Sequence, residues 1–295
     1  MRYAVPEIDQ IVELVRLASC ELPSDVLAAL RRSRGDAVGS AASTIEDILS
    51  NCAIAAGRSV PMCQDTGLPS FFVSGPGLDY VDRIALVDRC RQAVAVGVKS
   101  GLLRPNAVDV VSGVNTGDGT GFGIPQIHFD DPPAGSPAAP LRIDLLLKGG
   151  GSENVGRQYS LPEDLAGTGR DMDGVRACVI DAVVRAQGFG CAPGILGVCV
   201  GGDRSSGAVC AKRQLLRRLD GDRGPFHDFE DSLLDAINSL GIGPMGLGGS
   251  PTALGVAVAV MARHPACFFV SISYGCWATR RRAMVAGPDG SCVYE

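Results

Sequence analysis

The amino-acid sequence predicts an α/β fold, with mixed sheets wrapped by helices and a largely helical N-terminal part. Two patterns lead to this prediction. In the first hundred residues, apolar side chains recur at three- and four-residue spacing, which is the period of an amphipathic helix. Later in the chain, short apolar runs of strand length alternate with further helical stretches, and such alternation is typical of sheets covered by helices.

The individual elements follow from the same patterns, taken in chain order. Helices are predicted over residues 8–17, 25–32, 43–56, 80–99, 175–185, 206–219 and 230–240. Strands are predicted over residues 126–129, 141–147, 195–200, 256–261 and 268–273. The only linker-like segment, 132–140, lies between two strand-like runs, so we interpret it as a surface hairpin loop. Because no internal repeat is visible, we predict a single domain over residues 1–295.

Composition and charge narrow the functional class. Hydrophobic residues make up 46% and charged residues 20% of the chain, which is typical of a globular protein with a sizeable core. The net charge of -5 argues against a nucleic-acid or anionic-membrane partner, since either needs a concentrated basic face. The apolar runs are too short to span a membrane, and the N-terminus has no features of a signal peptide. These observations predict a cytoplasmic enzyme.

The cysteine content points to metal chemistry. Eleven cysteines in a chain of this size without a secretion signal favour reduced thiols, some of which bind a metal or a cluster. No pair has the C-x2-C spacing of a zinc site, so cysteines that share a metal must come from distant loops. Four cysteines lie in helix-like patterns and are predicted to be packed in the interior: Cys20, Cys90, Cys178 and Cys210.

The glycines are concentrated in four segments. Of 39 glycines, many fall in residues 115–123, 148–151, 188–202 and 241–249. Glycine serves where the backbone needs positive φ or must approach a ligand closely. Because each segment adjoins a strand-like run or a helix end, we predict that the four loops gather around one pocket.

Several motifs resemble one enzyme family. Residues 61–67 read PMCQDTG, and Cys-Gln-Asp-Thr-Gly resembles the most specific motif of the class I fumarases, which include two-subunit fumarate hydratases and L-tartrate dehydratases. Further motifs agree in order: LRPNAV (103–108), VNTG (114–117), KGGGSEN (148–154), CAPGILGVCVGG (191–202), LGIGPMGLGG (240–249), RHPA (263–266) and CWATRR (276–281). The resemblance implies a hydro-lyase that adds water to, or removes it from, a small dicarboxylate.

The resemblance also implies a cofactor. Family members hold a [4Fe–4S] cluster by three cysteines, and the matching residues here are Cys63, Cys191 and Cys276. The usual Cys-Pro-Pro has become Cys191-Ala192-Pro193, and Cys199 is the rival for the second position, although it lies in a strand-like run. For the third position the match favours Cys276 over Cys267. An iron without a thiolate can act as a Lewis acid on substrate oxygens.

Four further residues are implied to bind the substrate. By resemblance Gln64 and Asp65 contact it, and Asp65 assists the catalytic base. Arg104 matches an arginine that holds a carboxylate, for which a planar fork of donors is suited. Gly151 closes the KGGG loop, where a backbone N–H can meet a carboxylate oxygen.

Two other motifs leave alternatives open. The match of RHPA implies that His264 is catalytic, in its own site or in that of a neighbouring subunit, although a histidine after an apolar strand is usually only a polar residue at a strand end. Residues 280–282 form a run of three arginines. We interpret this run as intersubunit salt bridges or a solvated edge rather than as a phosphate site.

The resemblance bears on partners as well. One-chain members continue well past the CWATRR motif into a second domain, which supplies a proton-transferring threonine and further substrate ligands. This sequence ends at Glu295, so it resembles an alpha subunit that requires a separate beta subunit, and alpha–alpha pairing is also expected.

The substrate is predicted less directly. KGGGSEN and the stretch at 201–207 resemble fumarate hydratase alpha subunits more than tartrate ones, so the expected reaction is fumarate/(S)-malate interconversion, as in the tricarboxylic acid cycle. L-tartrate dehydration is the alternative. From a different class, a non-catalytic metal-binding scaffold subunit also remains open.

Overall fold

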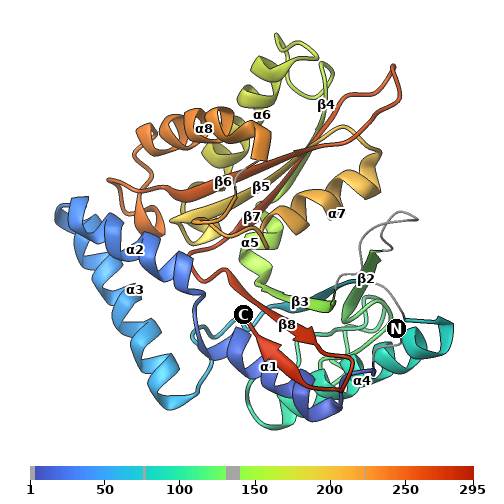
Figure 1. Ribbon diagram of the computed structural model, residues 1–295. Helices are drawn as coiled ribbons and strands as arrows, with labels where there is room; N and C mark the ends of the chain where they lie inside the picture. The colour runs from blue at the N-terminus through green and yellow to red at the C-terminus, as the bar shows by residue number, and fades with distance from the viewer. Residues whose placement is uncertain (1–3, 76–77, 131–139, 223) are drawn as a thin grey trace. The chain divides into compact units, whose positions relative to one another are not determined.

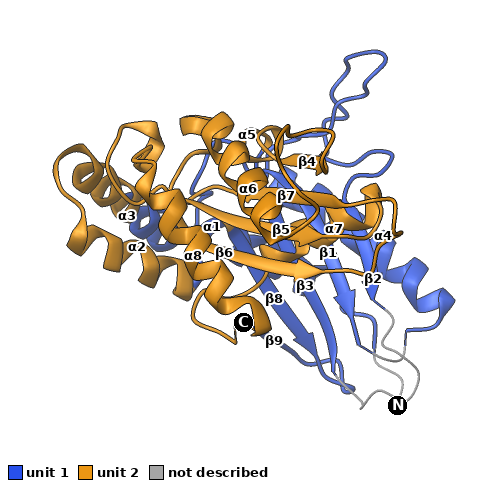
Figure 2. Cartoon of the chain, turned by 90° about the horizontal axis from the view of Figure 1, so that it is seen from above, with its two compact units in different colours: residues 1–23, 51–149, 280–295 blue, residues 24–50, 150–279 orange. Residues whose placement is uncertain are grey.

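The computed structural model describes residues 4–75, 78–130, 140–222 and 224–295 (Figure 1). They fall into two compact units, each with its own sheet (Figure 2). Unit 1 comprises residues 1–23, 51–149 and 280–295, and unit 2 comprises residues 24–50 and 150–279. Both units combine a mixed sheet with helices, which confirms the predicted α/β class. The assignment of residues 1–295 to a single domain stays a prediction.

Unit 1 is built on a five-stranded sheet in the order β2-β1-β3-β8-β9. Its strands are β1 (Leu68–Ser74), β2 (Gln126–Asp130), β3 (Leu141–Lys148), β8 (Arg280–Ala286) and β9 (Cys292–Tyr294). Only β1 and β2 run in parallel. The helices α1 (Ile8–Cys20) and α4 (Tyr80–Lys99) pack together, and their apolar side chains share one core with alternate residues of β1, β3 and β8.

The register of this sheet decides which loops meet. Leu68 at the start of β1 lies opposite Lys148 at the end of β3, and Leu147 lies opposite Arg280 at the start of β8. The segment that precedes β1, the segment that follows β3 and the first residue of β8 are therefore at the same end of the sheet.

Unit 2 has a four-stranded sheet in the order β4-β7-β5-β6. Its strands are β4 (Arg157–Ser160), β5 (Gly194–Val200), β6 (Ala253–Val260) and β7 (Phe269–Gly275). One face of β5 packs against α6 (Met172–Ala186) and α8 (His227–Ser239), and α7 (Arg204–Gln214) packs on the opposite face. Because β5 is covered on both faces, all of its residues are buried.

The remaining elements are the helices α2 and α3 and several short helical turns. Helix α2 (Ser24–Asp36) belongs to unit 2, and α3 (Gly39–Arg58) begins in unit 2 and ends in unit 1. Short helical turns are α5 (Gly150–Asn154), η1 (Gln187–Gly190), η2 (Gly224–Phe226) and η3 (Pro244–Gly246). None of the helices in the described part of the chain is long and apolar enough to cross a membrane.

Every predicted helix and strand has a counterpart, although α7 ends at Gln214 rather than at residue 219. Strands β1, β4, β8 and β9 were not predicted. The predicted hairpin loop at 132–140 lies almost entirely outside the described residues. Its flanking strands, β2 and β3, both pair with β1, which lies between them, so they do not form a hairpin with each other.

The arginine run is a correction. Arg280 is 1% exposed and Arg281 is 6% exposed, since β8 is an inner strand between β3 and β9. The interpretation of residues 280–282 as a solvated edge is therefore wrong.

A buried ion pair in unit 2 leads to a stability prediction. The Glu230 carboxylate is fully buried and accepts hydrogen bonds from Arg217 Nη1 and from the Val258 backbone N–H, both at 2.7 Å. Because Glu230→Ala removes the buried carboxylate that accepts both bonds, we expect the free energy of unfolding in urea to fall by about 3–5 kcal/mol. Glu46→Ala is the control, because its pair with Arg34 is exposed and the change should stay below about 1 kcal/mol. Equal losses for the two variants would contradict the prediction.

Candidate active site

The Cys-Gln-Asp-Thr-Gly segment of unit 1 is held by its threonine. Thr66 is 2% exposed, and its Oγ1 accepts hydrogen bonds from the Arg104 backbone N–H at 2.9 Å and from Asn106 Nδ2 at 3.3 Å. Asn106 Nδ2 also donates to the Gly67 carbonyl at 3.3 Å. Residues 63–67 and 104–106 are thus joined into one loop cluster at the end of the sheet where β1 begins.

Asp65 is the one acidic residue of this loop cluster, and both its carboxylate and its backbone are hydrogen-bonded. Its exposed carboxylate accepts a hydrogen bond from the Gly67 N–H at 2.9 Å, as in an Asx turn. Its backbone carbonyl accepts one from Arg280 Nη1 at 2.6 Å. A Cβ added at Gly149 would lie 2.8 Å from Asp65 Oδ2, so only glycine lets the loop after β3 approach the carboxylate this closely.

The exposed side chains around Asp65 are those predicted for substrate binding. Gln64 directly precedes Asp65, and Arg104 is attached to the same segment through Thr66. The structure therefore places Gln64, Asp65 and the backbone of Arg104 in one loop cluster. It also adds Arg280, which was predicted to form intersubunit salt bridges or a solvated edge.

In unit 2, Cys191 and Cys276 are neighbours. Cys191 follows η1 in a left-handed conformation with φ 55°, and its carbonyl accepts a hydrogen bond from the Trp277 N–H at 3.0 Å. Cys276 directly follows β7, whose last residue, Gly275, lies opposite Ile195 of β5. Burial, and then the charges of Cys276 and Cys191, raise the pKa of the Tyr274 phenol well above its usual value. Both thiols are thus close to one buried tyrosine.

Glycine segments surround Cys191. A Cβ at Gly190 would lie 2.5 Å from the Tyr274 ring, so glycine is required for the turn to rest on that ring. A Cβ at Gly151 would lie 3.3 Å from the Phe189 carbonyl, and the Met245 N–H donates to the Ala192 carbonyl at 2.8 Å. Three of the four predicted glycine segments therefore contribute residues around Cys191 in unit 2, whereas 115–123 belongs to unit 1.

The eleven cysteines differ in environment. All are reduced, and Cys63, Cys191 and Cys276 are half-buried residues outside regular helices and strands. Burial raises the pKa of Cys52 to about 11 and the pKa of Cys90 to about 12, so these thiols stay protonated at neutral pH, whereas iron binds the thiolate. Cys20, Cys90 and Cys178 are buried as predicted, and Cys210 is half-buried.

The rival ligand Cys199 is fully buried in β5. Its hydrogen bond with Cys210 raises the pKa of the Cys199 thiol, which does not favour it as a ligand. Cys63 belongs to unit 1, and Cys191 and Cys276 belong to unit 2, so the convergence of these three thiols stays a prediction. Across the described residues, no three His, Cys, Asp or Glu side chains form a group that could hold a metal ion.

His264 lies away from Cys191 and Cys276, the two proposed cluster ligands of its own unit. It is exposed in the loop between β6 and β7, where its Nδ1 accepts a hydrogen bond from the Ala266 N–H at 3.1 Å. This loop precedes the first residue of β7, whereas Cys276 follows the last. The seven residues of β7 separate the two by about 20 Å at strand rise. The structure thus does not bring His264 to Cys191 or Cys276, and its catalytic role stays a prediction.

Comparison with known proteins identifies the family. A family model described as fumarate hydratase (fumerase) matches residues 8–285. The chain belongs to the fumarate hydratase family. This confirms the resemblance inferred from the motifs.

Three curated relatives of this chain differ in length. A putative fumarate hydratase class I from Geobacillus stearothermophilus is 41% identical over 289 residues, which are 95% of this chain and 55% of the relative. A putative L(+)-tartrate dehydratase subunit alpha from Methanocaldococcus jannaschii is 34% identical over 92% of this chain and 95% of its own length. The L(+)-tartrate dehydratase subunit alpha of Escherichia coli K12 is 30% identical over 97% and 93%. The chain therefore spans about half of the first relative and nearly all of the other two.

Proposed function

We propose that this chain is the alpha subunit of an iron–sulfur hydro-lyase that interconverts fumarate and (S)-malate. The observation that carries the proposal is the loop cluster of unit 1, in which Thr66 ties the Asp65 segment to Arg104. Gln64, Asp65 and Arg104 belong to this one loop cluster, in a member of the fumarate hydratase family, and all three are exposed.

Three cysteines are proposed to hold the cofactor. Cys63, Cys191 and Cys276 would ligate a [4Fe–4S] cluster, and their half-buried positions and reduced state fit that role. When bound, such a cluster, with one iron lacking a thiolate, supplies a Lewis acid for the hydroxyl that leaves as water.

The chain's own side chains are proposed to bind the diacid and to move its proton. Arg104 offers a planar fork of donors to one carboxylate, and the Gln64 amide donates beside it. Asp65 assists removal of the proton next to a carboxylate, and the Gly67 N–H holds its carboxylate in one orientation. Gly151 stands in the first turn of α5, where backbone N–H groups have no partner within the helix, and it is proposed to meet a carboxylate oxygen.

The second candidate is L-tartrate dehydration. It is supported by the alpha subunits named for that reaction at 30% and 34% identity, whereas the 41% identical relative is named a fumarate hydratase. The name subunit alpha supports a separate beta subunit. The length of the class I relative supports it too, because that relative is nearly twice as long as this chain. Alpha–alpha pairing and a cytoplasmic location belong to the same proposal. A non-catalytic metal-binding scaffold would not need the carboxylate-binding set around Asp65.

The deciding experiment is an anaerobic assay of the reconstituted alpha–beta pair with (S)-malate and with L-tartrate. We expect kcat/KM to be higher for malate, and a preference for tartrate would select the second candidate. A colourless, zinc-containing pair that converts neither substrate would contradict the hydro-lyase.

Oxygen sensitivity is a separate prediction. An iron that no thiolate protects is the first to leave an oxidised cluster, so air should abolish activity, and ferrous iron with a reductant should restore most of it. Activity and the visible absorbance of the cluster would be followed together. Undiminished turnover after prolonged aeration with a chelator would exclude the cluster mechanism.

A further inference from the structure

Arg280 is buried beside the proposed base. It is 1% exposed, and it is the largest of the fully buried side chains in the described residues. It begins β8 opposite Leu147, next to the end of β3. Its Nη1 donates to the Asp65 carbonyl at 2.6 Å, and its Nη2 lies 3.6 Å from where a Cβ of Gly149 would be. The guanidinium thus binds the Asp65 segment and lies beside the Gly149 segment.

Fold stability does not account for an arginine at this position. The Arg280 Nε is buried and has no hydrogen-bond partner among the described residues. A buried donor without a partner is unfavourable, and buried charges are often replaced by apolar residues without loss of stability. A guanidinium at this position therefore calls for a functional reason.

We propose that Arg280 is a positioning residue for Asp65. This inference rests on the proposed function, in which Asp65 assists proton removal. Among the hydrogen bonds that hold Asp65, Arg280 Nη1 donates to its backbone carbonyl and the Gly67 N–H donates to its carboxylate. A bond from a charged donor is stronger than a neutral one, so Arg280 holds the backbone from which the base projects. An error of about 1 Å in the position of a catalytic group can cost about a hundredfold in rate.

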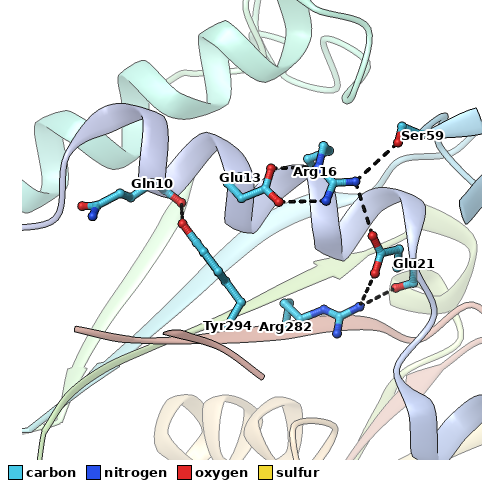
Figure 3. Close-up of polar contacts among 7 residues, drawn as sticks. All are labelled: Gln10, Glu13, Arg16, Glu21, Ser59, Arg282 and Tyr294. Atoms are coloured by element: carbon cyan, nitrogen blue, oxygen red, sulfur yellow. Dashed lines mark hydrogen bonds and ion pairs between the residues drawn. The ribbon is translucent and has the colours of Figure 1, made fainter. Parts of the chain in front are cut away.

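Arg282 provides a matched control on the same face of β8. Its Nη2 donates to Glu21 Oε2 at 3.4 Å, and Figure 3 shows that contact beside the Arg16–Glu13 pair. Arg280 is fully buried and Arg282 is half-buried, and the guanidinium of each donates to a backbone carbonyl, that of Asp65 for Arg280 and that of Glu21 for Arg282. Of the two, only Arg280 contacts Asp65.

The test compares Arg280→Met, Arg280→Lys and Arg282→Met. In the cluster-loaded alpha–beta pair, we expect Arg280→Met to lower kcat/KM about a hundredfold. Lysine keeps one charged donor, so Arg280→Lys should recover part of this loss. Arg282→Met should stay within about threefold of the unsubstituted pair. Adding Arg280→Met to Asp65→Asn should cost less than about threefold more, because a residue that acts through Asp65 has little left to position.

Hydrogen exchange gives a readout that needs neither the cluster nor turnover. In the cluster-free chain, Arg280→Met should speed exchange about tenfold in the peptide that contains Thr66 and Gly67, and Arg282→Met should leave that peptide unchanged. If the unsubstituted pair converts neither diacid, the proposed function fails and the exchange result alone decides the role of Arg280. Unchanged exchange, additive losses in the double variant, or an Arg280→Lys chain that does not fold would overturn the inference, since the last would assign Arg280 to the fold as a whole.

Discussion

Serine in place of Cys63, Cys191 or Cys276 is expected to lower the activity of the alpha–beta pair by at least about ten-thousandfold, since several kcal/mol of Lewis-acid stabilisation disappear with the iron. Each of the three variants removes one of only three proposed thiolate ligands. Iron and sulfide analysis, with visible absorbance under anaerobic conditions, would measure the loss of the cluster directly.

Two other cysteines serve as controls for this experiment. Cys267 is half-buried like the three proposed ligands, which makes it a matched control. Because Cys267 is not a proposed ligand, Cys267→Ser should keep both iron and activity. Cys199→Ser should also keep iron, although it changes a fully buried residue of β5 and should lower stability. If the Cys199→Ser chain lacked iron and the Cys191→Ser chain retained it, Cys199 and not Cys191 would be the second ligand.

The fold class could be predicted because most elements show their period in the sequence. The helices have one apolar face, and the β5 and β6 segments are nearly continuous apolar runs, which is typical of strands covered on both faces. Strand β8 was missed because it begins with three arginines, which suggest a solvent-exposed segment. Its interior position becomes clear only from the structure, in which the Arg280 guanidinium binds the Asp65 carbonyl and the Arg282 guanidinium binds Glu21.

The candidate site was predictable where its residues adjoin a specific motif. Gln64 and Asp65 belong to one short segment, and the contact with Arg104 depends on Thr66, which the motif already contains. The position of His264 could not be predicted in this way. Its distance from Cys276 follows from β7, which lies between them and which the sequence already predicted as a strand, whereas the RHPA match carries no information on distance.

The purified alpha chain is expected to bind iron yet show no measurable turnover, and addition of the beta subunit should restore it. The prediction rests on the relatives, because the chain spans 55% of the class I enzyme but 93–95% of proteins named subunit alpha. By resemblance, the proton-transferring threonine and further substrate ligands belong to the other part. Loss of acid–base catalysis removes about a hundredfold to ten-thousandfold in rate, and loss of substrate positioning removes a comparable further factor.

Gln64, Asp65 and Arg104 remain in the chain without its partner, so weak binding of a dicarboxylate should still be detectable by calorimetry. A Cys63→Ser chain purified in parallel controls for contaminating fumarase, since any activity common to both preparations is not due to the cluster. Malate–fumarate interconversion by the unsubstituted chain alone, above that background, would show that the base lies within these residues. Asp65, which is anchored by Arg280 and Gly67, would then be the first residue to substitute, and His264 the second.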